Sequence, residues 1–303
     1  MRGGIKEVAE YSLALLTIRL FGAMPRSVAR RVATILAWLG FHLATRQRTA
    51  GLHNLRMAFP EITEDERQRI LRGSFQNLAR LLVEFTHFPQ LNKTNISRFV
   101  VHEGLENYLE GLRRGRGVIF MTAHFGAWEL SSFAHAVYGY PLKFLVRPID
   151  NPRVEDLISS YRTSSGNVPI QRRSAARDVL KALRHNEAVG ILFDQNTTES
   201  EGVFAEFFGI PAATTPSIAL FALRTGAAVL PGFLVWDEAL KKHRLRLDPL
   251  VELVNTGDLD RDVLENTTRF NRILEDYVRQ YPDQWLWIHR RWKTRPDGEP
   301  PLY

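Results

Sequence analysis

Short apolar blocks alternate with amphipathic segments over most of the chain. The apolar blocks, such as residues 117–122 and 188–193, have the length of buried strands, and the segments between them repeat apolar residues at helical spacing. The predicted strands are 99–102, 117–122, 144–148, 188–193, 227–235 and 245–247, and the predicted helices are 104–112, 130–138, 174–183, 217–224 and 262–281. Strands that alternate with helices predict an α/β fold with a central, mostly parallel mixed sheet flanked by helices.

The pattern changes before residue 91. Residues 1–90 are predicted to form a helical region, followed by an α/β domain at residues 91–303. In the helical region, Thr63 and Glu66 form a capping box, which predicts a helix from there to residue 85. A polar stretch at residues 162–168 is predicted to be a loop of the α/β domain.

Two apolar runs lie near the start of the chain, at residues 11–23 and 32–44, and arginines flank them. Neither run has the 18 or more uncharged residues of a spanning helix. Acidic residues ahead of the first run and Arg19 within it argue against a signal peptide. Short apolar helices between arginines are typical of helices that lie in a membrane interface, and we expect this region to associate with a membrane. The alternative is a pair of helices packed on the core with solvated basic faces.

Charge and cysteine content narrow the possible functions. The chain of 303 residues has a formal net charge of +7, which favours an acidic partner such as nucleic acid, an anionic membrane, or an acidic carrier or substrate. A soluble basic protein without such a partner has the same composition. There is no cysteine, so disulfides, thiolate nucleophiles and zinc–thiolate sites are excluded.

The strongest candidate for chemistry is His124 with Glu129. His124 follows a predicted strand and Glu129 opens the next predicted helix, which places the histidine at the carboxyl end of a strand, where open α/β sheets build their sites. Gly126 permits a tight turn between them, so that the two side chains can meet. A histidine held by a carboxylate is a general base with a fixed tautomer. The alternative is a structural histidine in the core.

Two other predicted strands also end in polar residues. Arg147 lies at the end of the strand at 144–148, and Asp194 follows the strand at 188–193. Strand ends on one edge of a sheet lie near each other, so we expect Arg147 and Asp194 to converge on His124. Arg147 is a candidate to bind a phosphate or carboxylate group. The alternative is that it is an ordinary surface arginine. Thr214 and Thr215 cap a predicted helix and can equally bind an anion.

Several reaction classes lack their sequence signatures. No Gly-x-Ser-x-Gly elbow, P-loop or dinucleotide-binding glycine motif is present. His124 and Glu129 supply only two metal ligands, and we expect no metal and no cofactor. The tryptophans at 285, 287 and 292 stand among cations and predict a membrane-interface belt, a nucleic-acid platform, or a packed strand or hairpin.

Several stretches carry a resemblance to a known family: His124 to Glu129, Phe193-Asp194-Gln195, residues 207–211 with Thr214-Thr215-Pro216, residues 223–226, residues 54–60, and the tryptophan-rich residues 284–293. They resemble the bacterial lipid A biosynthesis acyltransferases, within the lysophospholipid acyltransferase superfamily. The superfamily motif is His-x-x-x-x-Asp, and the lipid A branch usually has glutamate, as at Glu129. The resemblance covers nearly the whole chain and implies a glycerol-3-phosphate-acyltransferase-like fold.

The resemblance also implies a reaction. In this family the histidine, here His124, removes a proton from a substrate hydroxyl, and the acid, here Glu129, orients it. The hydroxyl attacks a fatty acyl thioester, usually on acyl carrier protein, without a protein nucleophile. We expect backbone N–H groups after His124 and the Arg147 side chain to stabilise the oxyanion.

The predicted function is therefore acyl transfer to a hydroxyl of a lipid A precursor or related glycolipid at the cytoplasmic face of the bacterial inner membrane. Arg147, Asp194, Gln195, Thr214 and Thr215 are predicted to line the substrate site. Acyl carrier protein, the lipid acceptor and an anionic membrane surface are the expected partners, and nucleic acid is not. The alternatives are another acceptor, such as a phosphatidylinositol mannoside or aminoacyl lipid, a coenzyme A donor, a thioesterase that uses water, or a non-catalytic basic binding protein.

Overall fold

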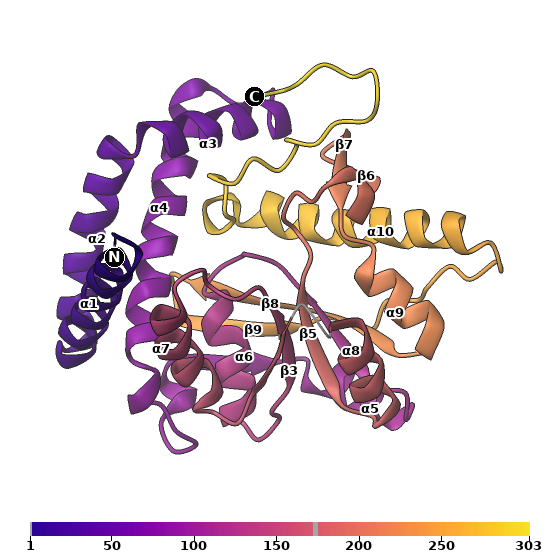
Figure 1. Cartoon of the computed structure of the whole chain (residues 1–303), viewed down its shortest axis with the longest axis horizontal. Helices are drawn as coiled ribbons and strands as arrows, with labels where there is room; N and C mark the ends of the chain where they lie inside the picture. The colour runs from indigo at the N-terminus through magenta and orange to yellow at the C-terminus, as the bar shows by residue number, and fades with distance from the viewer. Residues whose placement is uncertain (1, 172–174) are drawn as a thin grey trace.

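A seven-stranded sheet forms the centre of the computed structural model, which describes residues 2–171 and 175–303 (Figure 1). The strand order is β1-β9-β8-β2-β5-β3-β4. Strands β8, β2, β5, β3 and β4 are parallel to one another. Strand β9 is antiparallel to β8, and β1 is parallel to β9. The strands are β1 (Val100–Glu103), β2 (Val118–Thr122), β3 (Lys143–Val146), β4 (Val168–Gln171), β5 (Ala188–Leu192), β8 (Ala228–Asp237) and β9 (Lys242–Leu247). The predicted α/β fold with a mostly parallel mixed sheet is confirmed.

Helices cover both faces of this sheet. The helices of the described residues are α1 (Arg2–Ala23), α2 (Arg26–Leu43), α3 (Thr45–Ala58), α4 (Glu64–Thr86), α5 (Leu105–Arg113), α6 (Trp128–Val137), α7 (Pro152–Thr163), α8 (Ala175–Arg184), α9 (Ser217–Thr225) and α10 (Leu259–Gln280). Helices α5 and α6 pack with one face, and α8, α9 and α10 pack with the other. Ser174, the predicted start of the helix at 174–183, lies outside the described residues.

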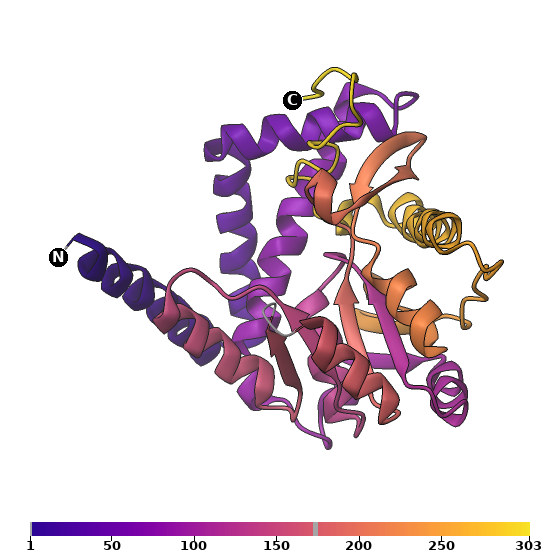
Figure 2. The same cartoon turned by 45° about the vertical axis from the view of Figure 1, so that its right-hand side comes forward.

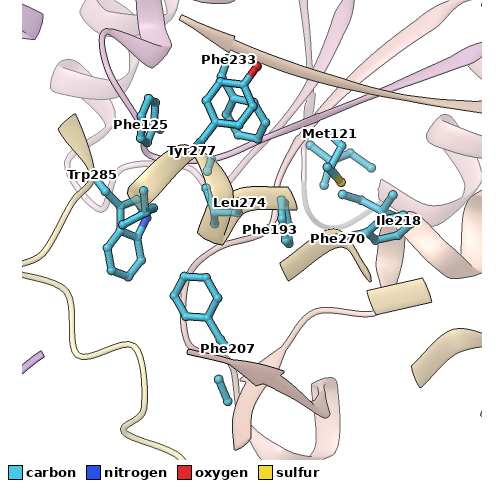
Figure 3. Packing of buried hydrophobic residues seen from close by; sticks show 14 of the residues in the cluster. Met121, Phe125, Phe193, Phe207, Ile218, Phe233, Phe270, Leu274, Tyr277 and Trp285 are labelled. Atoms are coloured by element: carbon cyan, nitrogen blue, oxygen red, sulfur yellow. The ribbon is translucent and has the colours of Figure 1, made fainter. Parts of the chain in front are cut away.

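Strand β2 is apolar at successive positions because it is buried on both sides. Ile119 and Met121 belong to one hydrophobic cluster, and Phe120 belongs to the other. The first cluster includes residues of α10; the ring of Tyr277 lies 4.3 Å from that of Phe233 between helix and sheet (Figure 3). The central strand thus fixes the position of the loop that follows it.

The helices before residue 90 also contact this core. Thr63 caps α4 and accepts a hydrogen bond from the backbone N–H of Glu66 at 3.2 Å, as the capping box predicted. Leu55 of α3 and Leu71 of α4 are fully buried in the same cluster as the sheet residues. The N-terminal half of helix α1, in contrast, projects outward beside α7 (Figure 2). Among the described residues, no helix is both long and apolar enough to cross a membrane.

The predicted loop at residues 162–168 is confirmed for residues 164–167, but its two ends belong to regular elements. Asn151 caps α7, which continues through Arg162, and residue 168 begins the edge strand β4. The four residues of β4 include two exposed positions and a proline, so their pattern is not that of a buried strand. Residues 203–214 form a separate two-stranded hairpin of β6 (Val203–Phe207) and β7 (Ile210–Thr214).

Candidate active site

The loop between β2 and α6 is held in a conformation that requires glycine. Gly126 has φ of +58°, and a Cβ atom there would lie 1.7 Å from the carbonyl oxygen of Leu234. The N–H of Gly126 donates to Gln284 O at 2.8 Å, and its carbonyl accepts from Asn77 Nδ2 at 3.0 Å. Residues from three distant parts of the chain therefore fix this turn and place His124 at the carboxyl edge of the sheet.

Three strand ends converge at this edge. Thr122 and Leu192 are in register on β2 and β5, so the residues two positions later lie side by side. His124 Nδ1 is 2.8 Å from Asp194 Oδ1, and the same oxygen accepts from the backbone N–H of His124 at 3.1 Å. Arg147, which follows β3, lines the same cavity as His124. The predicted convergence of His124, Arg147 and Asp194 is confirmed as geometry.

Glu129 does not make the predicted hydrogen bond with His124. Its carboxylate accepts two hydrogen bonds from Arg162, from Nε at 2.9 Å and from Nη2 at 2.5 Å. The reason is topological: Glu129 lies in the first turn of α6, Arg162 lies in the last turn of α7, and Asp194 occupies the Nδ1 side of His124. Glu129 still lines the cavity beside His124, but the carboxylate bonded to the imidazole is that of Asp194.

Electrostatics define the protonation of this pair. Burial alone would raise the pKa of Asp194, but the charge of His124 and hydrogen bonds from His124 and Trp285 outweigh it, and the pKa falls to about 2. An ionised carboxylate only accepts, so His124 carries its proton on Nδ1. In the neutral ring, Nε2 then carries no proton and is an acceptor. Burial lowers the pKa of His124, but the charge of Asp194 outweighs it and the net shift is upward.

The unprotonated Nε2 atom faces the side that substrates can reach. Gln195 Nε2 lies 3.3 Å from it, and the Gln195 side chain is exposed. Thr215 also lines the cavity. Thr214 does not: it is completely buried, and its hydroxyl accepts from Arg291 Nη2 at 2.5 Å. Thr214 is therefore a core residue in this structure, contrary to the expectation that it faces a substrate.

Some of the backbone N–H groups near His124 already have acceptors. Those of His124, Phe125 and Gly126 donate to Asp194, Ala123 O and Gln284 O, respectively. These three donors serve the turn itself, so the expected oxyanion donors after His124 are limited to N–H groups beyond Gly126. The side chain of Arg147 is exposed at the cavity and stays available as a donor.

The tryptophan-rich segment after α10 packs directly behind the site. Trp285 Nε1 donates to Asp194 Oδ2 at 2.9 Å, so each oxygen of that carboxylate has a donor. Trp285, Trp287 and Trp292 are almost completely buried. A membrane-interface belt and a nucleic-acid platform are both excluded for these rings, and the segment forms turns instead of the predicted strand or hairpin. Its role is to support the His124–Asp194 pair from the interior.

A cavity of about 720 Å³ leads from His124 into the molecule. Its inner wall is the sheet face that α6 covers. There Phe120, Gly190 and Phe144 lie in one row across β2, β5 and β3. Ser132 and His135 of α6 line the opposite wall. The cavity is therefore polar at the strand ends and mainly apolar below them.

No metal centre can be assigned to this site. Among residues 2–171 and 175–303, no three His, Asp or Glu side chains lie close enough together to hold an ion. His289 is half-buried near Asp194, but its Nε2 accepts from the backbone N–H of Asn196 at 2.8 Å, and partial burial lowers its pKa to about 4. The groups available for chemistry are thus the His124–Asp194 pair and the charged pair of Glu129 and Arg162.

Sequence reasoning missed two contributors to the site. Arg162 was assigned to a loop because the apolar residues of α7 do not form the pattern of a buried helix. Its one signal is Asn151 followed by proline, a helix start eleven residues earlier. The contact of Trp285 with Asp194 joins residues 91 positions apart, which no local pattern encodes.

Comparisons with known proteins agree on one family. The model of the bacterial lipid A biosynthesis acyltransferase family matches residues 5–294. A lipid A biosynthesis palmitoleoyltransferase of Escherichia coli is 28% identical over 94% of this chain and 91% of its own length. A lipid A biosynthesis lauroyltransferase from the same organism is 27% identical over 92% of this chain and 90% of its own length. A lipid A biosynthesis acyltransferase of Haemophilus influenzae is 27% identical over 86% of this chain and 80% of its own length.

Proposed function

The chain belongs to the bacterial lipid A biosynthesis acyltransferase family and is an acyltransferase, and we propose from this premise that it moves a fatty acyl group from acyl carrier protein to a hydroxyl of a lipid A precursor. The observation that carries the mechanism is the His124–Asp194 pair, in which His124 Nε2 faces the cavity and lies within hydrogen-bonding distance of only the exposed Gln195 amide among the described residues. With a fixed tautomer and a raised pKa, His124 is suited to general-base catalysis.

The proposed step needs no protein nucleophile. The acceptor hydroxyl displaces the Gln195 amide from His124 Nε2 and gives its proton to that nitrogen as its oxygen attacks the thioester carbonyl carbon. The C–O bond forms and a tetrahedral oxyanion results. When the intermediate collapses, the C–S bond breaks and the leaving sulfur takes the proton from the imidazolium. Asp194 stabilises that imidazolium and stays ionised throughout.

The remaining site residues are assigned roles by their positions. Arg147 donates to the oxyanion or to an anionic head group, and Gln195 and Thr215 contact the substrates. Glu129 acts together with Arg162: its negative charge raises the pKa of His124, less strongly than Asp194 does, and Arg162 keeps it in place. The apolar depth of the cavity between β5 and α6 holds the acyl chain.

We place the reaction at the cytoplasmic face of the inner membrane. The observation in support is that eleven of the eighteen exposed large apolar side chains of the described residues lie on α1 and α2, between residues 5 and 43. The first 48 residues also contain eight Lys and Arg but only two acids. An apolar surface flanked by cations suits an anionic lipid surface, so this helical region, up to about residue 90, associates with the membrane.

Purified protein with acyl carrier protein loaded with fatty acid and a lipid A precursor gives the direct test. We expect wild type to form the acylated lipid and His124→Ala to lose at least about a hundredfold in rate, because the base is gone. Mass spectrometry of the lipid product measures both the acceptor and the chain length. Release of free fatty acid without acylated lipid would replace the proposal with a thioesterase, and wild-type rates for His124→Ala would overturn the mechanism.

A further inference from the structure

Asn151 joins the outermost helix of the molecule to a wall of the active site. Its side-chain amide donates to Glu7 O at 2.9 Å and to Glu10 Oε2 at 2.9 Å, both on α1. Its carbonyl oxygen accepts from the backbone N–H groups of Arg153 and Val154, which caps α7. Asn151 is 5% exposed, so its own end of both sets of bonds is shielded from water. One side chain therefore serves as the cap of α7 and the tie to α1.

Arg162, at the opposite end of α7, contacts the site. Its guanidinium holds Glu129 through two hydrogen bonds, and both residues line the cavity of His124. Helix α7 has no fully buried residue; its apolar side is half-buried, with the Tyr161 ring stacked on Phe85 at 5.4 Å. A helix packed this lightly is positioned to a large extent by the polar contacts at its two ends.

Helix α1 packs on the body near its C-terminus, whereas its outer half is held mainly by the bonds of Asn151. Ile18 and Phe21, near its C-terminus, are buried, whereas Ile5 and Leu13 are 74% and 67% exposed. Among the described residues, the hydrogen bonds from the first half of α1 to other elements are those with Asn151. Figure 2 shows this half extending outward with α7 alongside it. A force on the outer half of α1 is therefore transmitted to α7.

We propose that Asn151 is a positioning residue that couples membrane binding by α1 to the active site. When the apolar side chains of α1 enter the bilayer, the helix becomes fixed, and the Asn151 tie fixes α7 with it. Arg162 then holds Glu129 beside His124, so acyl transfer is fastest at the membrane, where the lipid acceptor is. The occupant of the α1 surface is an anionic bilayer, as the flanking Lys6 and Arg19 favour. This coupling rests on the proposed function.

The two roles of Asn151 can be separated by substitution. Asn151→Asp keeps an oxygen that caps α7 but replaces the donating amide with a carboxylate that repels Glu10. Glu10→Gln alone keeps an acceptor for Asn151 and should behave as wild type. Combining the two substitutions restores the hydrogen bond with donor and acceptor exchanged, because the new amide donates to the new carboxylate. Asn255→Asp makes the same chemical change at an exposed asparagine and is the matched control.

The measurement compares rates with the acceptor in neutral detergent and in vesicles of phosphatidylethanolamine and phosphatidylglycerol. We expect vesicles to stimulate wild type and Asn255→Asp by about fivefold or more, a usual size for coupling between sites. Asn151→Asp should lose the stimulation while its rate in detergent stays near wild type, and the double variant should regain it. Stimulation of Asn151→Asp equal to wild type, or no recovery in the double variant, would overturn the proposal.

Hydrogen exchange tests the coupling independently of catalysis. Vesicles without acceptor should slow exchange in residues 152–163 of wild type, leave them unchanged in Asn151→Asp, and slow them again in the double variant. Asn151→Ser, which also keeps the cap but has no amide, should match Asn151→Asp, and thermal unfolding verifies that each variant is folded. Slowed exchange without any acyl transfer would support the coupling and overturn the proposed function. Unchanged exchange in wild type would overturn the coupling alone.

Discussion

At the residue scale, the site depends on how a buried carboxylate is satisfied. Asp194 is 2% exposed and yet ionised, because His124 and Trp285 each donate to one of its oxygens. That arrangement fixes the imidazole and raises its pKa above the ordinary value. The consequence is a base that binds its proton well but is neutral only at a pH above its raised pKa.

Removing the charge of Asp194 gives a pH-dependent prediction. In wild type, kcat/KM should rise with pH as His124 loses its proton, with a midpoint above about 6.5, the ordinary histidine value. Asp194→Asn removes the charge that raises this pKa, so the midpoint should move to lower pH. The plateau rate should also fall by about 10²–10⁴, because the preferred tautomer is no longer fixed. Asp65→Asn on the surface is the control, and an unmoved midpoint would contradict the proposed pairing.

The hydrogen bond from the Trp285 indole N–H can be tested separately from the packing of its ring. Trp285→Phe removes the N–H that donates to Asp194 and leaves one buried carboxylate oxygen without a partner, which should cost about 1–3 kcal/mol of stability. The pKa of Asp194 should rise, and the rate of acyl transfer should fall. Trp287→Phe is the matched control, since that buried indole donates to Pro282 O instead. Urea unfolding and the rate at fixed pH measure both effects, and equal rates for the two variants would refute the role of Trp285.

At the scale of the secondary-structure elements, β5 and α6 form the two walls of the deep cavity. Gly190 on β5 lies between Phe120 and Phe144, and a Cβ atom added there would meet its nearest neighbour, Leu142 Cδ1, at 3.5 Å. That is an ordinary van der Waals distance, so a small side chain fits without moving the strand. The glycine therefore leaves space that an acyl chain can occupy.

Filling this space should shorten the preferred acyl chain. We expect Gly190→Ala to favour a shorter donor modestly and Gly190→Val to do so more strongly, since one methylene in an apolar pocket changes selectivity by about 10–200-fold. Competition between two acyl carrier proteins that carry chains of different length gives the ratio directly. Thermal unfolding shows whether the strand tolerates the change. Loss of activity toward all chain lengths, with the fold intact, would place the acyl chain elsewhere.

Elements with strong local signals were predictable, and contacts between elements were not. The apolar runs of β2 and β5 predicted strands, and their parallel arrangement brought His124 and Asp194 together. The partner of His124 was nevertheless assigned to Glu129, because that residue is near in sequence. Arg162 and Trp285 come from segments whose positions depend on tertiary packing, and Thr214 faces the core because its hydroxyl satisfies the buried Arg291.

At the scale of the whole molecule, the exposed apolar side chains are concentrated on the helices α1 and α2. Leu13 and Leu16 are 67% and 55% exposed on α1, where they contribute little to packing. Their substitution should therefore change binding to lipid without changing the fold. The arginines of this region should add an attraction to anionic lipid that salt weakens.

Replacing both leucines tests this surface. Leu13→Asp with Leu16→Asp should reduce sedimentation with anionic vesicles by about tenfold or more, because burial of each leucine contributes about 1.5–3 kcal/mol. Leu259→Asp with Leu264→Asp changes two exposed leucines on α10, which are 44% and 43% exposed, and should bind as wild type does. Raising the salt concentration should weaken the binding of wild type. Equal sedimentation of the two double variants would exclude α1 as the membrane-binding element.

The contacts of Gln284 and Trp285 have a consequence for synthesis of the protein on the ribosome. Gly126 O accepts from Asn77, but the N–H of Gly126 and the second oxygen of Asp194 find their partners only in residues 284 and 285. A nascent chain that ends before these residues contains His124 and Asp194 without the contacts that orient them. The His124–Asp194 pair therefore gains these contacts only after residues 284 and 285 have been made, later than the strands and the helix α6 that line the cavity.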